Sequence, residues 1–185
     1  MLTPPFIRIA MLKYALFEYV PNRKLAKASF ELQDLHRMIL EFKDGRNIYT
    51  RWAAGQFARA LPAMDLSDIV IVCIPASTHY ANVRRWKRFS AMLSEMTGAI
   101  DGFDRIQVSG SRKRAHVTGE HELATNIKHY VHIDAEYFRG RKVLVIDDIY
   151  TTGLSSAAFI GAMEAAGANV TMAMFLARTK RYRIR

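Results

Sequence analysis

Residues 142–177 constrain the fold of this chain more than any other segment, because they predict a complete strand–helix–strand unit. The segment "KVLVIDD" is apolar and β-branched up to its two acids, which predicts a buried strand over 142–147. The segment "GLSSAAFIGAMEAAG" predicts a helix over 153–166 that ends at Gly167, and "NVTMAMFLA" predicts a strand over 169–177. Two strands joined by a helix are typical of a parallel pair with a right-handed crossover.

The rest of the chain shows the same alternation of helices and buried strands. The run "DIVIVCI" predicts a strand over 68–74 that is buried on both faces. The other expected elements are helices over 29–43, 47–61 and 79–100, a short strand over 103–108, a long polar loop over 109–126, and an edge strand or hairpin arm over 129–134. This order predicts an α/β fold with a mainly parallel, twisted sheet flanked by helices.

Length and composition narrow the class of protein. The chain has 185 residues, half of them hydrophobic, which is enough for one domain with a substantial core. No apolar run approaches the roughly 20 residues of a membrane span, and the N-terminus lacks the residue order of a signal peptide. We therefore expect a cytoplasmic protein with no membrane partner. Its one cysteine, Cys73, excludes a disulfide framework and a cysteine-based zinc ribbon within the chain.

The charge of the chain is strongly positive and clustered. The formal net charge is +10, and the pI is near 9.9. The basic residues form three clusters: Arg84, Arg85, Lys87 and Arg88; Arg112, Lys113 and Arg114; and Arg178, Lys180, Arg181, Arg183 and Arg185. Each cluster alone is compatible with a solvated basic surface. The three together favour a polyanionic partner, either nucleic acid or a phosphate-rich small molecule.

The segment "VLVIDDIYTTGLSS" (143–156) carries the clearest chemical signal. In an open α/β sheet, ligands bind beyond the carboxyl ends of the strands, where Asp147 and Asp148 are expected. Two carboxylates there suit a vicinal diol or a divalent cation. The turn that follows opens a helix at Gly153, whose N-terminal N–H groups and nearby hydroxyls suit an anion. A sugar phosphate matches both halves.

Three other interpretations of this segment are weaker. A nucleotide hydrolase requires a phosphate loop ending in Gly-Lys, and the chain contains no such dipeptide. A phospho-receiver domain would carry its paired acids near the start of the domain, whereas here a single strand is expected after them. A strand that simply ends in a helix cap explains Asp or Thr over 148–152, but not the whole ordered set of acids, threonines, glycine and serine.

The same segment closely resembles the 5-phosphoribosyl-1-pyrophosphate (PRPP) motif of the type I phosphoribosyltransferases: four apolar residues, two acids, then Thr-Thr-Gly-x-[ST]. The flanks resemble the ComF-type enzymes associated with competence. Residues 36–61 are similar to a helix-turn-helix of that family, residues 69–96 to its first core strand, Pro-containing loop and basic helix, and residues 175–178 to its last strand. The ComF-type N-terminal zinc ribbon is lacking, since the chain has one cysteine.

The resemblance implies a type I phosphoribosyltransferase core over 36–185, with residues 1–35 as a variable N-terminal segment or hood. It implies that Asp147 and Asp148 are the catalytic acids that contact the ribose hydroxyls. The expected 5-phosphate-binding residues are Tyr150, Thr151, Thr152, Gly153, Leu154 and Ser155. The expected pyrophosphate-binding residues are Pro75, Ala76, Ser77 and Thr78. Arg112, Lys113 and Arg114 match the mobile loop that closes over PRPP in these enzymes.

The activity that the resemblance implies is a glycosyltransferase reaction of the pentosyltransferase class. The phosphoribosyl group would pass between pyrophosphate and an unidentified acceptor, expected to be a nitrogenous base. Mg²⁺ would enter through PRPP rather than through direct protein ligands, and a homodimer is expected. The alternative is a non-catalytic PRPP sensor or a nucleic-acid-binding accessory protein, for example in DNA uptake, in which the basic clusters contact DNA or RNA.

Overall fold

A computed structural model describes residues 12–61, 65–109, 127 and 130–179 of the chain. Its central feature is a five-stranded sheet with the order β1-β7-β6-β2-β3, in which every neighbouring pair is parallel. The strands are β1 (Leu12–Tyr19), β2 (Ile69–Cys73), β3 (Ile100–Asp101), β6 (Lys142–Tyr150) and β7 (Asn169–Thr179). The expected α/β fold with a mainly parallel sheet is confirmed.

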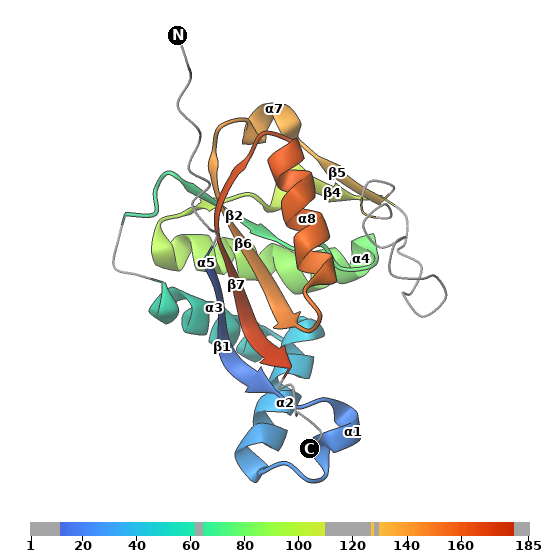
Figure 1. The fold of residues 1–185 in the computed structure, drawn as a ribbon. Helices are drawn as coiled ribbons and strands as arrows, with labels where there is room; N and C mark the ends of the chain where they lie inside the picture. The colour runs from blue at the N-terminus through green and yellow to red at the C-terminus, as the bar shows by residue number, and fades with distance from the viewer. Residues whose placement is uncertain (1–11, 62–64, 110–126, 128–129, 180–185) are drawn as a thin grey trace.

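Helices cover both faces of this sheet. The helical elements are α1 (Asn22–Leu25), α2 (Phe30–Lys43), α3 (Asn47–Ala60), α4 (His79–Asn82), the π-helical turn η1 (Val83–Lys87), α5 (Arg88–Thr97), α7 (Ala135–Phe138) and α8 (Leu154–Ala165). Helix α8 lies over one face, and α3 and α5 lie behind the other (Figure 1). The arrowheads of β1, β6 and β7 point toward α2 in this view.

Successive side chains of β6 point to opposite faces of the sheet, and they belong to two separate layers of the core. Leu144 and Ile146 pack with the buried side chains of α2, α3 and α5, including Phe42. Val143 and Val145 pack on the opposite face with residues of α8 such as Phe159. A strand with apolar residues on both faces is what a parallel sheet covered by helices requires. The hydrophobic run in the sequence is therefore explained by burial on both sides.

The predicted strand–helix–strand unit is confirmed, but its first strand is longer than expected. Strand β6 continues beyond residue 147 to Tyr150, because β7 extends alongside it. Asp147, Ile149 and Tyr150 pair in register with residues of β7. The two acids consequently lie within a paired strand rather than at a frayed end. Pairing with β7 fixes the position of their backbone.

The prediction of a single strand over 103–108 is wrong in its first half. Residues Phe103–Arg105 form a 3₁₀ turn, and only β4 (Ile106–Val108) is extended. The carboxylate of Asp101 accepts a hydrogen bond from the backbone N–H of Phe103 at 2.9 Å, which favours the turn. Strand β4 then pairs antiparallel with β5 (Val131–Ile133) in a separate two-stranded sheet. The expected hairpin arm over 129–134 is confirmed by β5.

The predicted helix over 79–100 is divided into three parts. A short α4 passes into η1 and then into α5, which ends at Gly98 in the left-handed conformation. The next residues form β3, a short strand that the sequence pattern did not indicate. A π-helical turn widens the helix by one residue, which changes the direction in which the side chains before and after it point. This matters for the basic cluster that begins at Arg84.

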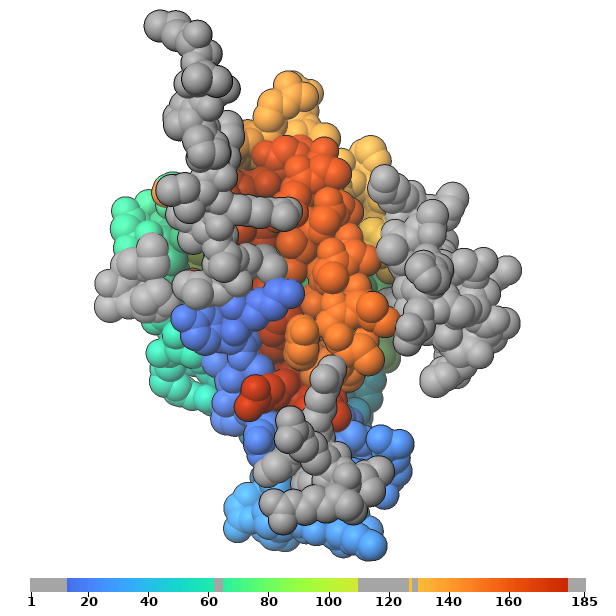
Figure 2. All heavy atoms as spheres, in the orientation of Figure 1, coloured from blue at the N-terminus to red at the C-terminus, as the bar shows by residue number. Residues whose placement is uncertain are grey.

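The N-terminal part of the described chain contributes to the sheet and to its carboxyl end. Strand β1 forms the edge of the main sheet beside β7, and α1 and α2 follow it. In the space-filling view the blue atoms of α1 and α2 lie at the lower end of the molecule, below the orange and red atoms of α8 and β7 (Figure 2). The division into segments 1–35 and 36–185 stays a prediction. None of the helices that the structure describes is long and apolar enough to cross a membrane.

Candidate functional site

A cavity of about 430 Å³ lies at the carboxyl ends of β2 and β6, which are neighbours in the sheet. Residues from the two strand ends, the helix after β6, α2, η1 and β1 enclose it. Its lining residues are Tyr19, Lys43, Ile74, Pro75, Ala76, Ser77, Arg85, Asp147, Asp148, Ile149, Tyr150, Thr151, Gly153, Ser155, Ser156 and Phe175. The edge of the sheet at which the acids were expected to act is therefore hollow and lined with polar groups.

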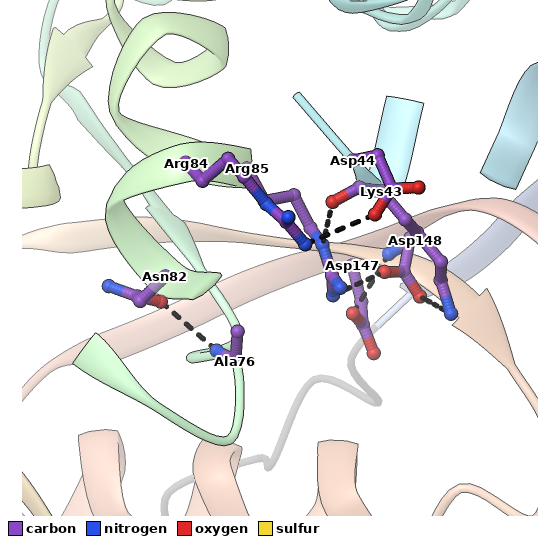
Figure 3. A network of polar contacts seen from close by, with 8 residues as sticks. All are labelled: Lys43, Asp44, Ala76, Asn82, Arg84, Arg85, Asp147 and Asp148. Atoms are coloured by element: carbon purple, nitrogen blue, oxygen red, sulfur yellow. Dashed lines mark hydrogen bonds and ion pairs between the residues drawn. The ribbon is translucent and has the colours of Figure 1, made fainter. Parts of the chain in front are cut away.

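The two acids of β6 have different surroundings. Asp148 is 5% exposed, and its carboxylate contacts two cations: the Nη1 of Arg85 lies 2.7 Å from Oδ2, and the Nζ of Lys43 lies 3.3 Å from Oδ1. Asp147 is half-buried, and its carboxylate accepts a hydrogen bond from the backbone N–H of Asp148 at 2.8 Å. Figure 3 shows Lys43 and Arg85 directed at Asp148, with Asp147 beside it.

The pKa of Asp147 differs from that of an ordinary aspartic acid. Loss of hydration raises it from 3.8 to about 8, and the negative charge of Asp148 adds to the rise. The hydrogen bond from the backbone of Asp148 and the charges of Lys43 and Arg85 act in the opposite direction but are weaker. Asp147 therefore binds its proton more tightly than an ordinary aspartic acid, while Asp148 is paired with two cations.

Lys43 and Arg85 were not predicted as site residues. Lys43 is the last residue of α2, and Arg85 lies in η1. The Nε of Arg85 also donates to the backbone carbonyl oxygen of Lys43 at 3.4 Å, so the end of α2 and η1 are joined at the point where both reach Asp148. A signal was present in the sequence: "KDG" places a lysine at a helix end directly before a glycine turn. Nothing local indicates which strand that turn faces.

The turn after Lys43 leaves no room for a side chain at Gly45. This glycine has φ +70°, and a Cβ there would collide with the backbone carbonyl oxygen of Arg84. The neighbouring Asp44 accepts a contact from the Nη2 of Arg84 at 3.1 Å. The backbone of the turn therefore approaches η1 closely, which brings Lys43 and Arg85 to the same side of the cavity.

The loop after β2 is held in place by a buried side chain. The Oδ1 of Asn82, which is 6% exposed, accepts a hydrogen bond from the backbone N–H of Ala76 at 3.0 Å. Pro75, Ala76 and Ser77 line the cavity. Thr78 does not; its hydroxyl instead accepts a hydrogen bond from the backbone N–H of Ala81 at 3.1 Å and caps α4. Of the four residues predicted to bind pyrophosphate, the structure thus places three at the cavity and gives the fourth a capping role.

The turn after β6 places a glycine against an aromatic ring. Gly153 has φ +84° and precedes the first residue of α8, and a Cβ there would collide with the hydroxyl of Tyr150. The Tyr150 ring packs edge-on against Phe175, with the ring centroids 4.8 Å apart. The hydroxyl of the buried Ser156 donates to the carbonyl oxygen of Gly153 at 2.9 Å. The first turn of α8 is consequently a rigid, narrow helix start, of the kind that binds anions.

The predicted 5-phosphate-binding residues divide into two groups. Tyr150, Thr151, Gly153 and Ser155 line the cavity. Thr152 and Leu154 are exposed outside its lining, and the Thr152 hydroxyl accepts a hydrogen bond from the backbone N–H of Leu154 at 3.4 Å. The basic residues predicted for the mobile loop, 112–114, lie outside the described residues.

A further residue that the sequence did not indicate is Tyr19, at the end of β1. It lines the cavity, and burial raises the pKa of its hydroxyl, with an added contribution from the negative charge of Asp148. Its ring stacks on that of His36 with a centroid distance of 4.9 Å, and the Nδ1 of His36 lies 2.9 Å from the carbonyl oxygen of Val20. Strand β1 thus contributes the aromatic ring of Tyr19 to the lining of the cavity.

A larger cavity, of about 1030 Å³, lies at the opposite end of the sheet. It lies between the starts of β6 and β7, strand β1 and the end of α3, and side chains such as Leu144, Met172 and Leu61 line it. Its charged groups are at the rim, where the exposed side chains of Lys142 and Asp68 form an ion pair at 2.7 Å. Its lining lacks the converging acids and cations of the smaller cavity. The volume of a cavity alone therefore does not identify the candidate functional site.

Within the parts of the chain that the structure describes, no group of three or more His, Cys, Asp or Glu side chains is placed to hold a metal ion. Asp147 and Asp148 are the carboxyl groups in the lining of the smaller cavity. Carboxylate oxygens suit Mg²⁺, which commonly binds to proteins through one or two carboxylates together with the phosphates of a substrate.

Comparisons with known proteins do not identify a family for this chain. No protein-family model matches the chain, and no curated protein matches it. Among solved structures, one described as "Structure of the allosteric regulatory enzyme of purine biosynthesis" aligns with a TM-score of 0.44 and 16% sequence identity. The alignment covers 69% of this chain and 25% of that one, so the chain spans about a quarter of the neighbour's length. A likeness of this degree identifies neither the family nor the function.

Proposed function

We propose that this chain is a type I phosphoribosyltransferase-like protein of ComF type that binds PRPP at the cavity between β2 and β6. The observation that carries the proposal is the convergence of three unlike groups on one cavity: the acids Asp147 and Asp148, the glycine turn at Gly153, and the loop at Ala76. Each suits a different part of PRPP. Carboxyl groups suit the ribose diol, a helix start suits the 5-phosphate, and a loop that carries the hydroxyl donor of Ser77 suits a diphosphate.

The reaction that fits this ligand is transfer of the phosphoribosyl group to a nitrogen of an acceptor base. The lone pair of the nitrogen forms a bond to C1 of the ribose, while the bond from C1 to the pyrophosphate oxygen breaks and its electrons leave with pyrophosphate. Positive charge develops on the ribose and negative charge on the leaving group, so cations near the leaving group accelerate the step. Mg²⁺ bound to pyrophosphate would supply part of that charge.

The binding site is tested by a thermal-shift titration with PRPP, with and without Mg²⁺. A ligand present at a hundredfold excess over its Kd stabilises the folded state by about 2.7 kcal/mol, which is readily detected. We expect a Mg²⁺-dependent shift in the wild-type protein that is lost in the Asp147→Asn, Asp148→Asn double variant. An absent shift in the wild type, or an equal shift in the variant, contradicts the proposed site.

The activity is tested separately from binding. Incubation with PRPP and a panel of purine and pyrimidine bases should release pyrophosphate with at least one base. Release with a base establishes a transferase. Binding of PRPP without turnover on any base would support the alternative of a PRPP sensor.

The alternative of a nucleic-acid-binding accessory protein has one observation in its favour. Arg84, Lys87 and Arg88 are exposed on η1 and the start of α5, so three cations of the first basic cluster face solvent. Binding of DNA or RNA that weakens steeply with salt, together with absent turnover, would favour this alternative. A homodimer is proposed on resemblance alone and is checked by sedimentation.

A further inference from the structure

The carboxylate of Asp148 is occupied within the protein itself. Both of its oxygens contact cations, Arg85 at 2.7 Å and Lys43 at 3.3 Å, and its side chain is 7% exposed. A carboxylate in this position is poorly placed to serve as the main acceptor for a sugar diol. Asp147 is in the opposite situation, because it lines the cavity and its described hydrogen bond is with the backbone N–H of Asp148. Two neighbouring acids of the same residue type therefore have different surroundings.

Lys43 and Arg85 retain donors that can face a ligand. The side chain of Arg85 is 18% exposed and that of Lys43 is 29% exposed, and both residues line the cavity. Arginine has five N–H donors, and its bonds to Asp148 and to the carbonyl oxygen of Lys43 use two of them. The ammonium group of lysine has three donors, and the ion pair with Asp148 uses one. Each cation is thus held by Asp148 and still has N–H donors that are not used by Asp148.

The position of the two cations is set by backbone packing between the end of α2 and η1. Gly45 lies against the backbone carbonyl of Arg84, where no side chain fits, and this contact fixes the end of α2 against η1. The π-helical form of η1 changes the direction of the side chains that follow α4, and π-helical turns are frequent at functional sites. Figure 3 shows Arg85 between the loop at Ala76 and the carboxylate of Asp148.

The charges of the cavity add up to a site for an anion. Lys43 and Arg85 contribute two positive charges, and Asp148 contributes one negative charge. Burial and the charge of Asp148 raise the pKa of Asp147 to about 8, which reduces the negative charge that Asp147 adds near pH 7. The cavity therefore presents two cations to a ligand, although its most visible sequence feature is a pair of acids.

We propose that the two acids have different tasks, and that Lys43 and Arg85 form a cation pair that selects the pyrophosphate group of the ligand. Asp147 receives the ribose diol, whereas Asp148 is a positioning residue that holds the two cations. This inference rests on the proposed PRPP site and assigns a specificity element within it. Guanidinium and ammonium groups are suited to diphosphate, because charge-assisted bonds to its oxygens strengthen as the leaving group gains negative charge.

The test compares two probes that each represent one part of PRPP: inorganic pyrophosphate and ribose 5-phosphate. Affinities are measured by calorimetry in the intact chain. We expect Lys43→Met and Arg85→Gln each to weaken pyrophosphate binding by about tenfold or more, the loss typical of one charge-assisted contact. Binding of ribose 5-phosphate should stay within about twofold. Lys87→Gln is the matched control, because it removes one exposed positive charge from the same η1 turn and should change neither affinity.

The two acids are separated by the same pair of probes. Asp147→Asn should weaken ribose 5-phosphate and leave pyrophosphate unchanged, and Asp148→Asn should do the reverse. Asp148 is proposed to act through the cations. The effect of Asp148→Asn on the affinity for pyrophosphate should therefore largely disappear in the Arg85→Gln background, which a double-mutant cycle measures. A variant that merely unfolds the site would lose both probes and would show a lowered Tm without either ligand.

The outcomes separate this inference from the proposed function. If the wild type binds PRPP and pyrophosphate, but Lys43→Met and Arg85→Gln bind pyrophosphate as tightly as the wild type, the cation pair is wrong and the PRPP site stands. Equal loss of ribose 5-phosphate in Asp147→Asn and Asp148→Asn overturns the division of tasks. If the wild type binds pyrophosphate through the two cations but binds neither PRPP nor ribose 5-phosphate, the proposed function is wrong and the anion site stands.

Discussion

The two cavities of the main sheet differ in the chemical character of the side chains that line them. The cavity at the amino ends of β6 and β7 is the larger of the two, at about 1030 Å³ against about 430 Å³, yet its lining is mainly apolar and its ion pair is at the exposed rim. The cavity at the carboxyl ends contains a buried carboxylate, two cations and the turn at Gly153, which has no room for a side chain.

The polar and charged groups of the candidate site lie where strand pairing and tight turns restrict the backbone. Apolar residues at the amino-end cavity stabilise the fold through burial, and their substitution is expected to change stability alone. Residues at the carboxyl-end cavity are held by strand pairing, a π-helical turn and tight glycines, and their substitution is expected to change ligand binding. The four predictions below test this contrast.

The first prediction concerns Leu144, which lines the amino-end cavity and is 2% exposed. Leu144→Ala should lower the free energy of unfolding by about 2–5 kcal/mol, through lost burial and an enlarged cavity. The affinity for PRPP should not change below the unfolding temperature. Urea denaturation and calorimetric titration measure the two quantities. The control is Met96→Ala, at a 44% exposed position of α5, and a Leu144 loss as small as this control would contradict the burial argument.

The second prediction concerns Gly153. Gly153→Ala places a side chain in the left-handed conformation, which costs about 1–2 kcal/mol, and it also meets the hydroxyl of Tyr150. We expect this loss of stability together with a loss of ribose 5-phosphate binding. Gly161→Ala is the matched control within α8, because nothing lies within 4 Å of its added Cβ; it should be neutral or stabilising by up to about 1 kcal/mol. Unchanged ribose 5-phosphate binding in Gly153→Ala would argue against a phosphate site at this turn.

The third prediction concerns pH. The pKa of Asp147 is raised from 3.8 to about 8 in the folded state, so the folded state binds a proton that the unfolded state has released between these values. The stability contribution of this group therefore falls as pH rises from about 4 to about 8, and levels off above that. Asp147→Asn removes the titrating group and should flatten this part of the profile. Thermal melts of both proteins across this range provide the measurement, and parallel profiles would show that Asp147 titrates normally.

The fourth and smallest effect is expected at the rim of the amino-end cavity. The ion pair between Lys142 and Asp68 is more than half exposed on both sides, so Lys142→Met should lower the free energy of unfolding by about 1 kcal/mol at most. Any loss should diminish further in high salt. Urea denaturation at low and high salt is the test. A large and salt-independent loss would mean that this pair resembles the buried contacts of Asp148, and the contrast between the two cavities would fail.

Much of the fold follows from local patterns in the sequence. The unbroken apolar runs before Cys73 and Asp147 specify strands buried on both faces, and a parallel sheet covered by helices is the arrangement that satisfies them. Short elements were predicted less well. The 3₁₀ turn at Phe103 depends on a hydrogen bond to the Asp101 side chain, and the π-helical turn at Val83 has the same residue types as an ordinary helix.

The candidate site was predicted in part for the same reason. Residues that follow one another in the chain, such as Asp147 and Gly153, form a local pattern and were found. Lys43, Arg85 and Tyr19 come from three other elements, and no local pattern links them to β6. Thr78 belongs to the loop after β2, but its hydroxyl caps α4 and it does not line the cavity.

The sequence by itself determined the type of fold and the chemical type of the site, because strand burial, helix starts and turns depend on neighbouring residues. Only the tertiary structure decided how the charges of the site are shared. Arg85 and Asp148 are 63 positions apart in the chain, and their contact exists because β2 and β6 are neighbours and η1 packs on the turn at Gly45. A motif with two adjacent acids thereby lines a cavity in which two cations are held by one of those acids.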